Sequence, residues 1–498
     1  MKIATTSEMR AVEAAAIADG IPEFTLMKRA GAAAAKLITS WMRRWHFSRV
    51  VFLCGGGNNA GDALVAATLL SGKHSMALWL HRPLESLHGA AASAAAEVPS
   101  AVKTSAVTDF DALEIAPGDL IVDGMLGIGL AGEVRPPLTE VIARVNASQL
   151  PVIALDVPSG MDSDTGLGRC PGGEALHAAC TVTFGLPKRG LFTPDGVRFT
   201  GTLTVADIGL TAYAEGAACA AYTESEAMAD LPRFAADAHK NRRGRLLVMA
   251  GSRRYPGAAA LATLSALRGG AGVVYSVLPA GTPSHLANAA IPVEVAATGQ
   301  GGFAAAPDWK NFRDPTALVA GPGWGDDVPV SVLTEVLKFP GELLLDADAL
   351  NLLARHPEIW NARANVVLTP HPGEAERLRI AFGIPEAGSR SELAAALADR
   401  LGAVVVLKGA RTVTAGGAGE ITLNTSGSPD LATAGSGDVL AGLIGAFLAN
   451  GTLVTAAAKL GVFIHGRAGE NGGRGVIADD LPTKISRVMK NLEKGLFF

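Results

Sequence analysis

The stretch TAGSGDVLAGLIGAF, residues 433–447, places one carboxylate in front of an apolar helix pattern. A helix that starts after Gly435, Ser436 and Gly437 leaves backbone N–H groups unpaired, and the small side chains let a phosphate approach them. Asp438 lies in the first turn, where the helix dipole is expected to keep its pKa low. A plain helix-start carboxylate is one interpretation. The other is phosphoryl transfer, which needs donors for the migrating group and a carboxylate to deprotonate the attacking hydroxyl.

A basic motif precedes this loop. VVVLKGARTVTA predicts a buried strand followed by Lys408 and Arg411, whose side chains can hold nucleotide phosphates together with the N–H groups of the glycine-rich loop. A strand that ends in a tight turn is the alternative. The two motifs together favour a nucleotide site.

A glycine-rich stretch also lies in the first half of the chain. GGGNNAGD, residues 55–62, falls between a strand predicted at 49–53 and a helix predicted at 61–70, where a helix N-terminus favours an anion. It is neither GxGxxG nor a Walker loop. A structural turn and a phosphate or dinucleotide site are equally compatible with this stretch alone.

Two further apolar runs end in polar residues. Asp123 ends one run and precedes a glycine-rich loop at 127–133, and Asp156 and Ser159 follow the other. Ligands collect outside the carboxyl ends of strands in an open parallel sheet, so these residues predict a site there. The alternatives are a loop cap for Asp123 and a turn residue before Pro158 for Asp156.

The elements that must position these residues follow from the apolar runs. Strands predicted at 76–80, 119–123 and 151–156 alternate with helical segments such as 136–146. This alternation is typical of a doubly wound α/β domain with a parallel sheet.

The apolar periodicity fades between residues 211 and 243, and a second α/β series begins at LLVMAGS. We therefore expect a domain boundary near residue 220, with one domain at 1–220 and a second at 221–498.

The net charge of −4 favours small-molecule partners and argues against nucleic acid or an anionic membrane. No export signal is visible at the N-terminus. The four cysteines form no CxxC pair, so neither a disulfide framework nor a zinc site is indicated, and a reducing cytoplasm is expected. They are Cys54, Cys170, Cys180 and Cys219.

Residues 439–458 carry no charge, which on length alone could span a bilayer. Asn450 and Gly451 interrupt this run, so it predicts two buried helices instead of a membrane span.

The motifs of the first half resemble the NAD(P)HX epimerase domain of bifunctional NAD(P)H-hydrate repair proteins. The resemblance implies that Asp156 is the acid/base for epimerisation at C6 of the hydrated nicotinamide. It also implies a potassium ion held by Asn59, Asp123 and Ser159, and Lys188 in TFGLPKRGL near a phosphate. The substrate-binding residues that it implies are Asn58, Asn59, Asp62, Gly127, Ile128, Gly129, Leu130, Ala131, Gly132, Glu133 and Asp156.

This chain departs from the family pattern in two places. It has NNAGDA where NNGGDG is expected and LMKRAG where an acidic LMENAG-like stretch is usual. Ala60 and Ala63 thus replace glycines at points where the backbone could approach the ligand, which puts the pose in question.

Residues 240–490 resemble the C-terminal NAD(P)HX dehydratase domain of the ribokinase-like superfamily, through GSRRYPGAAALATLSALRGGAG, VAGPGWG, LLLDADALN, LTPHPGEAERL and TAGSGD in that order. The resemblance implies that Ala258, Gly323 and His371 contact the hydrate and that Asp438 contacts its reacting hydroxyl. The nucleotide-binding residues that it implies are Lys408, Gly409, Ala410, Arg411, Thr412 and Gly437. For His371, a histidine satisfied in a turn between two prolines is the alternative.

The implied reaction is phosphorylation of the C6 hydroxyl by ADP, followed by loss of phosphate to give NADH or NADPH, AMP and phosphate. Magnesium is expected to neutralise the migrating group. The implied partners are NADHX, NADPHX and ADP in a homo-oligomeric protein, with ATP left open as the donor.

Two other functions fit parts of the sequence. One is a small-molecule kinase with an accessory N-terminal domain, since the TAGSGD loop alone is shared with kinases. The other is a first domain that serves as a non-catalytic binding module.

Overall fold

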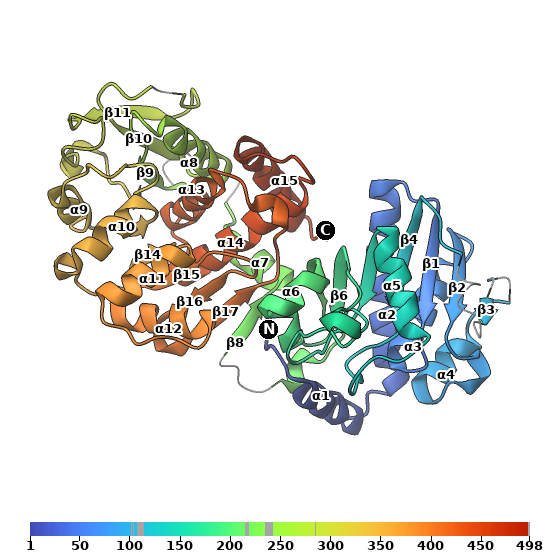
Figure 1. Cartoon of the computed structure of the whole chain (residues 1–498). Coiled ribbons are helices and arrows are strands. Elements are labelled where there is room, and N and C mark those ends of the chain that lie inside the picture. The colour runs from blue at the N-terminus through green and yellow to red at the C-terminus, as the bar shows by residue number, and fades with distance from the viewer. Residues whose placement is uncertain are drawn as a thin grey trace. The chain divides into compact units, whose positions relative to one another are not determined.

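The computed structural model describes residues 1–100, 102, 104–106, 114–214, 219–234, 243–283 and 285–496. Within them the chain forms two compact units, a first one up to residue 217 and a second one from residue 218. Figure 1 shows the elements of both. Each unit has its own sheet, and each is described by itself.

The first unit is built on seven parallel strands in the order β3-β2-β1-β4-β5-β6-β7. The order reverses between β1 and β4, as in a doubly wound sheet. Its elements are α1 (Thr6–Ala18), α2 (Glu23–Trp45), β1 (Arg49–Cys54), α3 (Asn58–Leu70), β2 (Ser75–Leu80), α4 (Gly89–Ala96), β3 (Thr104–Ala106), β4 (Asp119–Gly124), α5 (Leu138–Ser148), β5 (Val152–Leu155), β6 (Cys180–Phe184), α6 (Pro194–Thr200) and β7 (Thr202–Ala206).

Alternate residues of β1 enter two different cores. Val50 and Phe52 pack with α2, α3 and α4, whereas Val51 and Leu53 pack with α5 on the other face. Because side chains of a strand alternate between faces, a strand covered by helices on both sides is apolar throughout. The five apolar residues from Val50 to Cys54 meet this requirement.

The second unit has a ten-stranded sheet in the order β11-β10-β9-β12-β13-β14-β15-β16-β17-β8. Only the pairs β15–β16 and β16–β17 are antiparallel. Its elements are β8 (Cys219–Tyr222), α7 (Glu224–Asp230), β9 (Arg245–Met249), α8 (Pro256–Arg268), β10 (Val273–Pro279), β11 (Ile291–Val295), β12 (Ala317–Ala320), α9 (Val330–Val336), β13 (Glu342–Leu345), α10 (Asp348–Arg355), β14 (Val366–Leu368), α11 (Pro372–Ala381), α12 (Arg390–Leu401), β15 (Val404–Leu407), β16 (Val413–Ala415), β17 (Ile421–Asn424), α13 (Ser436–Ala449), α14 (Val454–Glu470) and α15 (Leu481–Glu493).

The uncharged run 439–458 forms two helices, as predicted. Helix α13 ends at Ala449 and α14 begins at Val454, and Gly451 between them has a φ of 82°. Helix α13 packs closely on α8, because a Cβ at Gly442 would lie 2.1 Å from the carbonyl oxygen of Ala262. In the part of the chain that the structure describes, no helix combines the length and the apolar character that crossing a membrane requires.

Two helices begin earlier than predicted. Helix α3 starts at Asn58, not residue 61, because extended Gly57 caps it and its carbonyl accepts from the N–H groups of Ala60 and Gly61. Helix α13 likewise starts at Ser436. The polar residues of both glycine-rich stretches therefore lie on rigid first turns and not in loops.

Candidate active sites

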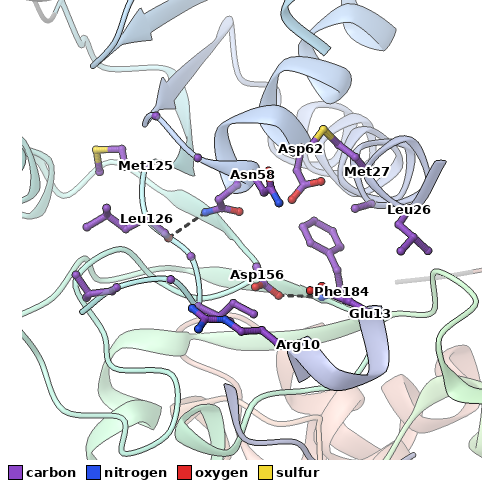
Figure 2. A pocket seen from close by; sticks show the side chains of 18 of the residues that line it. Arg10, Glu13, Leu26, Met27, Asn58, Asp62, Met125, Leu126, Asp156 and Phe184 are labelled. Carbon is purple, nitrogen blue, oxygen red and sulfur yellow. Dashed lines mark hydrogen bonds between the residues drawn. The ribbon is translucent and has the colours of Figure 1, made fainter. Parts of the chain in front are cut away.

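The first unit holds a cavity of about 650 Å³ at the carboxyl ends of its strands (Figure 2). Its walls come from the segments after β1, β2, β4 and β5, from the end of β6, and from helices α1 to α3. This is the place where an open parallel sheet binds ligands.

Most of the residues predicted to bind substrate line this cavity. Gly132 and Glu133, in the same loop, lie outside the described lining. The lining residues predicted from sequence are Asn58, Asn59, Asp62, Gly127, Ile128, Gly129, Leu130, Ala131 and Asp156.

Sequence reasoning missed the contribution of the first two helices to this cavity. They add charged and apolar lining residues, namely Arg10, Glu13, Ile17, Glu23, Leu26, Met27 and Ala30. These helices precede the first strand, and their apolar pattern is that of any helix packed on a sheet.

The structure brings Asn59, Asp123 and Ser159 together beneath the cavity. Asp123 is fully buried and accepts hydrogen bonds from the Ser159 hydroxyl at 2.6 Å and the Ser159 N–H at 2.8 Å. The Asn59 amide donates to the Leu126 carbonyl at 3.0 Å, which leaves the Asn59 Oδ1 atom buried without a partner. Burial raises the pKa of Asp123 to about 6, against the opposing effect of its hydrogen bonds with Ser159 and Met125.

Asp156 follows β5 in a left-handed conformation, with φ 64°. Its Oδ1 atom accepts from the Lys188 ammonium, which also donates to the Thr183 hydroxyl at 3.2 Å and the Phe184 carbonyl at 2.8 Å. The Lys188 side chain is only 1% exposed. Its three protons are thus donated to protein oxygens, although Lys188 is among the residues that line the cavity, and its place near a phosphate stays a prediction.

The two alanines that replace glycines of the family pattern do not line the cavity. Ala60 and Ala63 are fully buried in the core between the sheet and α2, on the side of α3 that faces away from the ligand space. Their methyl groups fill core volume and do not obstruct the approach of a ligand to the helix N-terminus.

The second site is centred on the first turn of α13. Asp438 is half-buried there and accepts no hydrogen bond from the described residues. The Lys408 ammonium lies beside this turn, 3.6 Å from the point that a Cβ at Gly437 would occupy. It is held by the carboxylate of Asp346 at 2.6 Å, and Asp346 also accepts from the Thr369 hydroxyl at 2.7 Å.

The pKa of Asp438 differs from the expectation for a helix start. Burial first, and then the charges of Asp346 and Asp348, raise the pKa of Asp438 to about 7, although Lys408 opposes the shift. Desolvation and neighbouring carboxylates outweigh the helix dipole here. A carboxylate that titrates near neutral pH is suited to act as a general base.

His371 caps helix α11, as its alternative interpretation predicted. Its Nδ1 atom accepts from the N–H groups of Gly373 at 2.9 Å and Glu374 at 3.3 Å, while the side chain stays half exposed. Glu374 lies 3.4 Å from His371 Nε2 and 3.9 Å from Lys408 Nζ. It therefore connects His371 to the group around Asp438.

Arg411 does not offer its side chain to a phosphate. The guanidinium group is buried and donates to the Thr425 carbonyl at 2.8 Å. The expected role of this side chain in holding phosphates is therefore not supported, and the Lys408 ammonium and the backbone of the segment remain for that purpose. The other segment residues predicted to bind nucleotide are Lys408, Gly409, Ala410 and Thr412, which follow β15.

Ala258 and Gly323 lie against each other at the start of α8. A Cβ at Gly323 would come within 2.6 Å of the Ala258 Cβ, and Gly323 has a φ of 63°. On the same helix, the Leu261 side chain lies 2.5 Å from the point that a Cβ at Gly435 would occupy. Ala258 and Leu261 thus lie on the side of α8 that adjoins the glycine-rich loop, and Gly323 packs against Ala258.

Sequence reasoning assigned no role to Asp346 or Glu374, although both lie in motifs that it used for the resemblance. Asp346 directly follows β13, and Glu374 lies in the first turn of α11. The rule that strand ends carry the site would have singled out Asp346.

The raised pKa of Asp438 predicts that the stability of the second unit depends on pH. The unfolded carboxyl titrates near about 4, so between pH 4 and 7 the folded chain holds a proton that the unfolded chain has lost, and stability falls as the pH rises. Asn cannot titrate. We expect the melting temperature of the second unit to fall less from pH 5 to pH 8 in Asp438→Asn than in the wild type, as followed by calorimetry. Equal pH dependence in both proteins would contradict the raised pKa.

Comparison with known proteins gives matches over both units. Residues 246–491 match the family model described as NAD(P)H-hydrate dehydratase, and residues 23–190 match that described as YjeF-related protein N-terminus. The bifunctional NAD(P)H-hydrate repair enzyme Nnr of Coxiella burnetii is 37% identical over 95% of this chain and 96% of its own length. The protein of the same name from Gloeobacter violaceus is 38% identical, over 93% and 92%.

Solved structures resemble the second unit. The ADP/ATP-dependent NAD(P)H-hydrate dehydratase of Bacillus subtilis, co-crystallised with ATP/Mg2+, is 30% identical and covers 55% of this chain and 99% of its own, with a TM-score of 0.46.

The fold and the two sites define a two-domain α/β enzyme with a seven-stranded parallel sheet in the first domain and a ten-stranded mixed sheet in the second. The full-length relatives identify the family of this enzyme. The chain belongs to the family of bifunctional NAD(P)H-hydrate repair enzymes. The resemblance found in the motifs and the predicted fold class are thereby confirmed.

Proposed function

We propose that this chain repairs hydrated nicotinamide dinucleotides in two steps. Residues 1–220 interconvert the R and S epimers of NADHX and NADPHX, and residues 221–498 dehydrate the S epimer while ADP is converted to AMP and phosphate. The observation that carries the proposal is Asp438, with a pKa of about 7, beside Lys408 at the exposed N-terminus of α13. That arrangement joins a base to a phosphate-binding helix end.

In the second domain, Asp438 takes the proton from the C6 hydroxyl, and the oxygen attacks the terminal phosphorus of the nucleotide. AMP departs with the electrons of the broken P–O bond. Phosphate then leaves C6, assisted by the lone pair of the ring nitrogen, and loss of a proton from C5 gives the dihydronicotinamide. Phosphate is a far better leaving group than hydroxide, which explains the use of a kinase-like site for a dehydration.

Lys408 and the N–H group of Gly437 would hold the transferred phosphoryl group, since the Ser436 N–H already donates to the Thr433 carbonyl at 3.3 Å. The described residues contain no group of three or more His, Cys, Asp or Glu side chains that could hold a metal. Mg²⁺ would therefore be bound mainly through the nucleotide phosphates, as is usual for this ion, and would neutralise their charge.

In the first domain, the oxygens around Asn59 fit a potassium ion. The unpartnered Oδ1 of Asn59, the Ser159 hydroxyl and the carboxylate of Asp123 offer neutral and singly charged oxygens, which suit a large monovalent cation. Potassium bound there would fix the 127–131 loop against α3 and so shape the substrate cavity.

Asn59→Leu removes the unpartnered oxygen, together with the amide donor to Leu126, and keeps the branched shape of the side chain. We expect it to lose the dependence of epimerisation on potassium and to lower the rate by about tenfold or more, as found for disturbed metal ligation. The rate is measured with potassium exchanged for tetramethylammonium. Asn59→Asp, which keeps an oxygen there, is the matched control. A wild-type potassium response in Asn59→Leu would contradict the assignment.

Product analysis separates this function from that of a small-molecule kinase. With hydrated NADH and ADP, the repair enzyme yields NADH, AMP and free phosphate in equal amounts, whereas a kinase yields a stable phosphorylated product. The same assay with ATP in place of ADP identifies the donor.

The cellular setting and assembly remain predictions. Cys54 and Cys170 are buried and form no disulfide with any described residue, and the reducing cytoplasm is expected from the sequence. A homo-oligomer is expected from the family resemblance.

A further inference from the structure

Asp62 is a carboxyl group in the first cavity without an assigned chemical role. It lies on α3, and Figure 2 shows its side chain and that of Asp156 on opposite sides of one space. Asp62 forms no hydrogen bond and no ion pair with any residue that the structure describes. A half-buried carboxyl that faces a substrate cavity and has no protein partner is free to bond a ligand.

The two aspartates differ in their surroundings. The negative charge of Asp156 is compensated by the buried Lys188 ammonium. Asp62 has no such cation in contact among the described residues, although the charges of Asp156, Lys188 and Glu13 all act on it. Burial first, and then the charges of Asp156 and Glu13, raise the pKa of Asp62 well above its usual value against the opposing effect of Lys188. One carboxyl thus has a cation in contact and the other has none, an asymmetry that allows acid and base roles to be divided between two like groups.

We propose that Asp62 is a second catalytic residue of the epimerase, the acid that acts opposite the base Asp156. This inference rests on the proposed epimerisation at C6. Inversion at this carbon requires a group to leave one face and return to the other. A proton donor on one side of the cavity assists the departure of the group, and a proton acceptor on the opposite side assists its return.

Inversion at C6 takes place by loss of water from one face and its return to the other. Asp62 gives its proton to the C6 hydroxyl, and the C6–O bond breaks with its electron pair leaving on water, while the lone pair of the ring nitrogen forms the N1=C6 double bond. A water molecule then adds to the opposite face of C6. The π electrons return to nitrogen as Asp156 accepts the proton of the attacking water. The hydrate is re-formed with inverted configuration, and the reverse reaction exchanges the two roles.

The carboxylate of Asp156 has a second effect in this step. The ring carries a positive charge after water has left, and an anion across the cavity stabilises it. Loss and return of water also has an isotopic consequence. Each inversion replaces the C6 oxygen by one from the solvent, whereas opening of the ring at the N1–C6 bond would retain it.

The test uses the full chain without nucleotide, so that dehydration does not remove the epimers. Purified S-NADHX is incubated in H₂¹⁸O. The R epimer is then separated, and its ¹⁸O content is determined by mass spectrometry. Wild type, Asp62→Asn and Glu13→Gln are compared. Asp62→Asn is isosteric and retains a hydrogen-bond donor, so we expect kcat to fall by about a hundredfold with KM little changed. Dehydration of the S epimer with ADP is the internal control and should be unaffected.

Two results support the inference together: ¹⁸O in every molecule of early R product, and a selective loss of kcat in Asp62→Asn. A wild-type rate in Asp62→Asn overturns it, as does a loss in Glu13→Gln without one in Asp62→Asn. Retention of ¹⁶O in the R epimer overturns the water-loss step. If the wild-type chain itself does not epimerise, the proposed function fails, which is a separate outcome.

Discussion

Asp438→Asn is expected to lower the dehydration of S-NADHX by at least about a hundredfold while epimerisation continues at the wild-type rate. The general base would be lost, whereas the N–H groups of α13 and the Lys408 ammonium would remain to bind the nucleotide. The rate is measured as recovery of absorbance at the reduced-nicotinamide band with saturating ADP. Because the base must be ionised, the wild-type rate should also rise as the pH increases through about 7.

The binding of nucleotide is the control for this variant. Asp438→Asn should bind ADP as tightly as the wild type or more tightly, because a negative charge next to the phosphates has been removed. Dehydration at the wild-type rate would show that Asp438 is not the base. Equal loss of both activities would indicate general damage to the protein.

Asp156→Ala is expected to separate the two epimers. In the presence of ADP the variant should convert the S epimer at the normal rate and leave most of the R epimer, which then disappears only at the spontaneous rate of epimerisation. The reason is that the second domain accepts one configuration and the first domain no longer supplies it. Consumption of both epimers at the wild-type rate would contradict the epimerase assignment.

Removal of Asp156 also leaves the Lys188 ammonium buried without its counterion, and a buried unpaired charge is costly. Asp156→Asn retains an oxygen that can accept from Lys188. Lys188→Met combined with Asp156→Asn removes the charge altogether. The three variants to compare are Asp156→Ala, Asp156→Asn and the double variant. If all three lose R-epimer consumption equally while the melting temperature of the first unit stays at the wild-type value, the loss reflects chemistry and not unfolding.

The location of the first site could be predicted from the sequence because it depends on topology. Asp123 and Ser159 are separated by 36 positions, yet their side chains are 2.6 Å apart, since Asp123 lies at the end of β4 and Ser159 follows β5, its neighbour in the parallel sheet. The same rule placed Asp156 at the cavity. A rule about strand ends needs only the pattern of apolar runs, which the sequence displays.

The electrostatics of the sites could not be predicted in the same way. The pKa of Asp438 was expected to be low because the helix dipole is visible in a sequence, whereas burial and the charges of Asp346 and Asp348 depend on the fold. Lys188 was expected near a phosphate because the resemblance of TFGLPKRGL to the family implied it. Only the structure shows it buried against Asp156.

The helices that precede the first strand were missed for a related reason. Arg10 and Glu13 of α1 reach the cavity from more than a hundred positions before Asp156, and no motif connects them to it. Their contribution follows from how α1 packs on the carboxyl edge of the sheet. Helix packing of this kind leaves an amphipathic pattern, which does not reveal whether the polar side faces solvent or a ligand.

The most direct test is recovery of reduced nicotinamide from an equilibrated mixture of the two NADHX epimers. The full chain with excess ADP and potassium should restore the absorbance expected for the whole mixture in one enzyme-dependent process, with one AMP and one phosphate for each NADH formed. A rapid phase that stops at the S fraction, followed by slow spontaneous recovery, would contradict a single chain that repairs both forms.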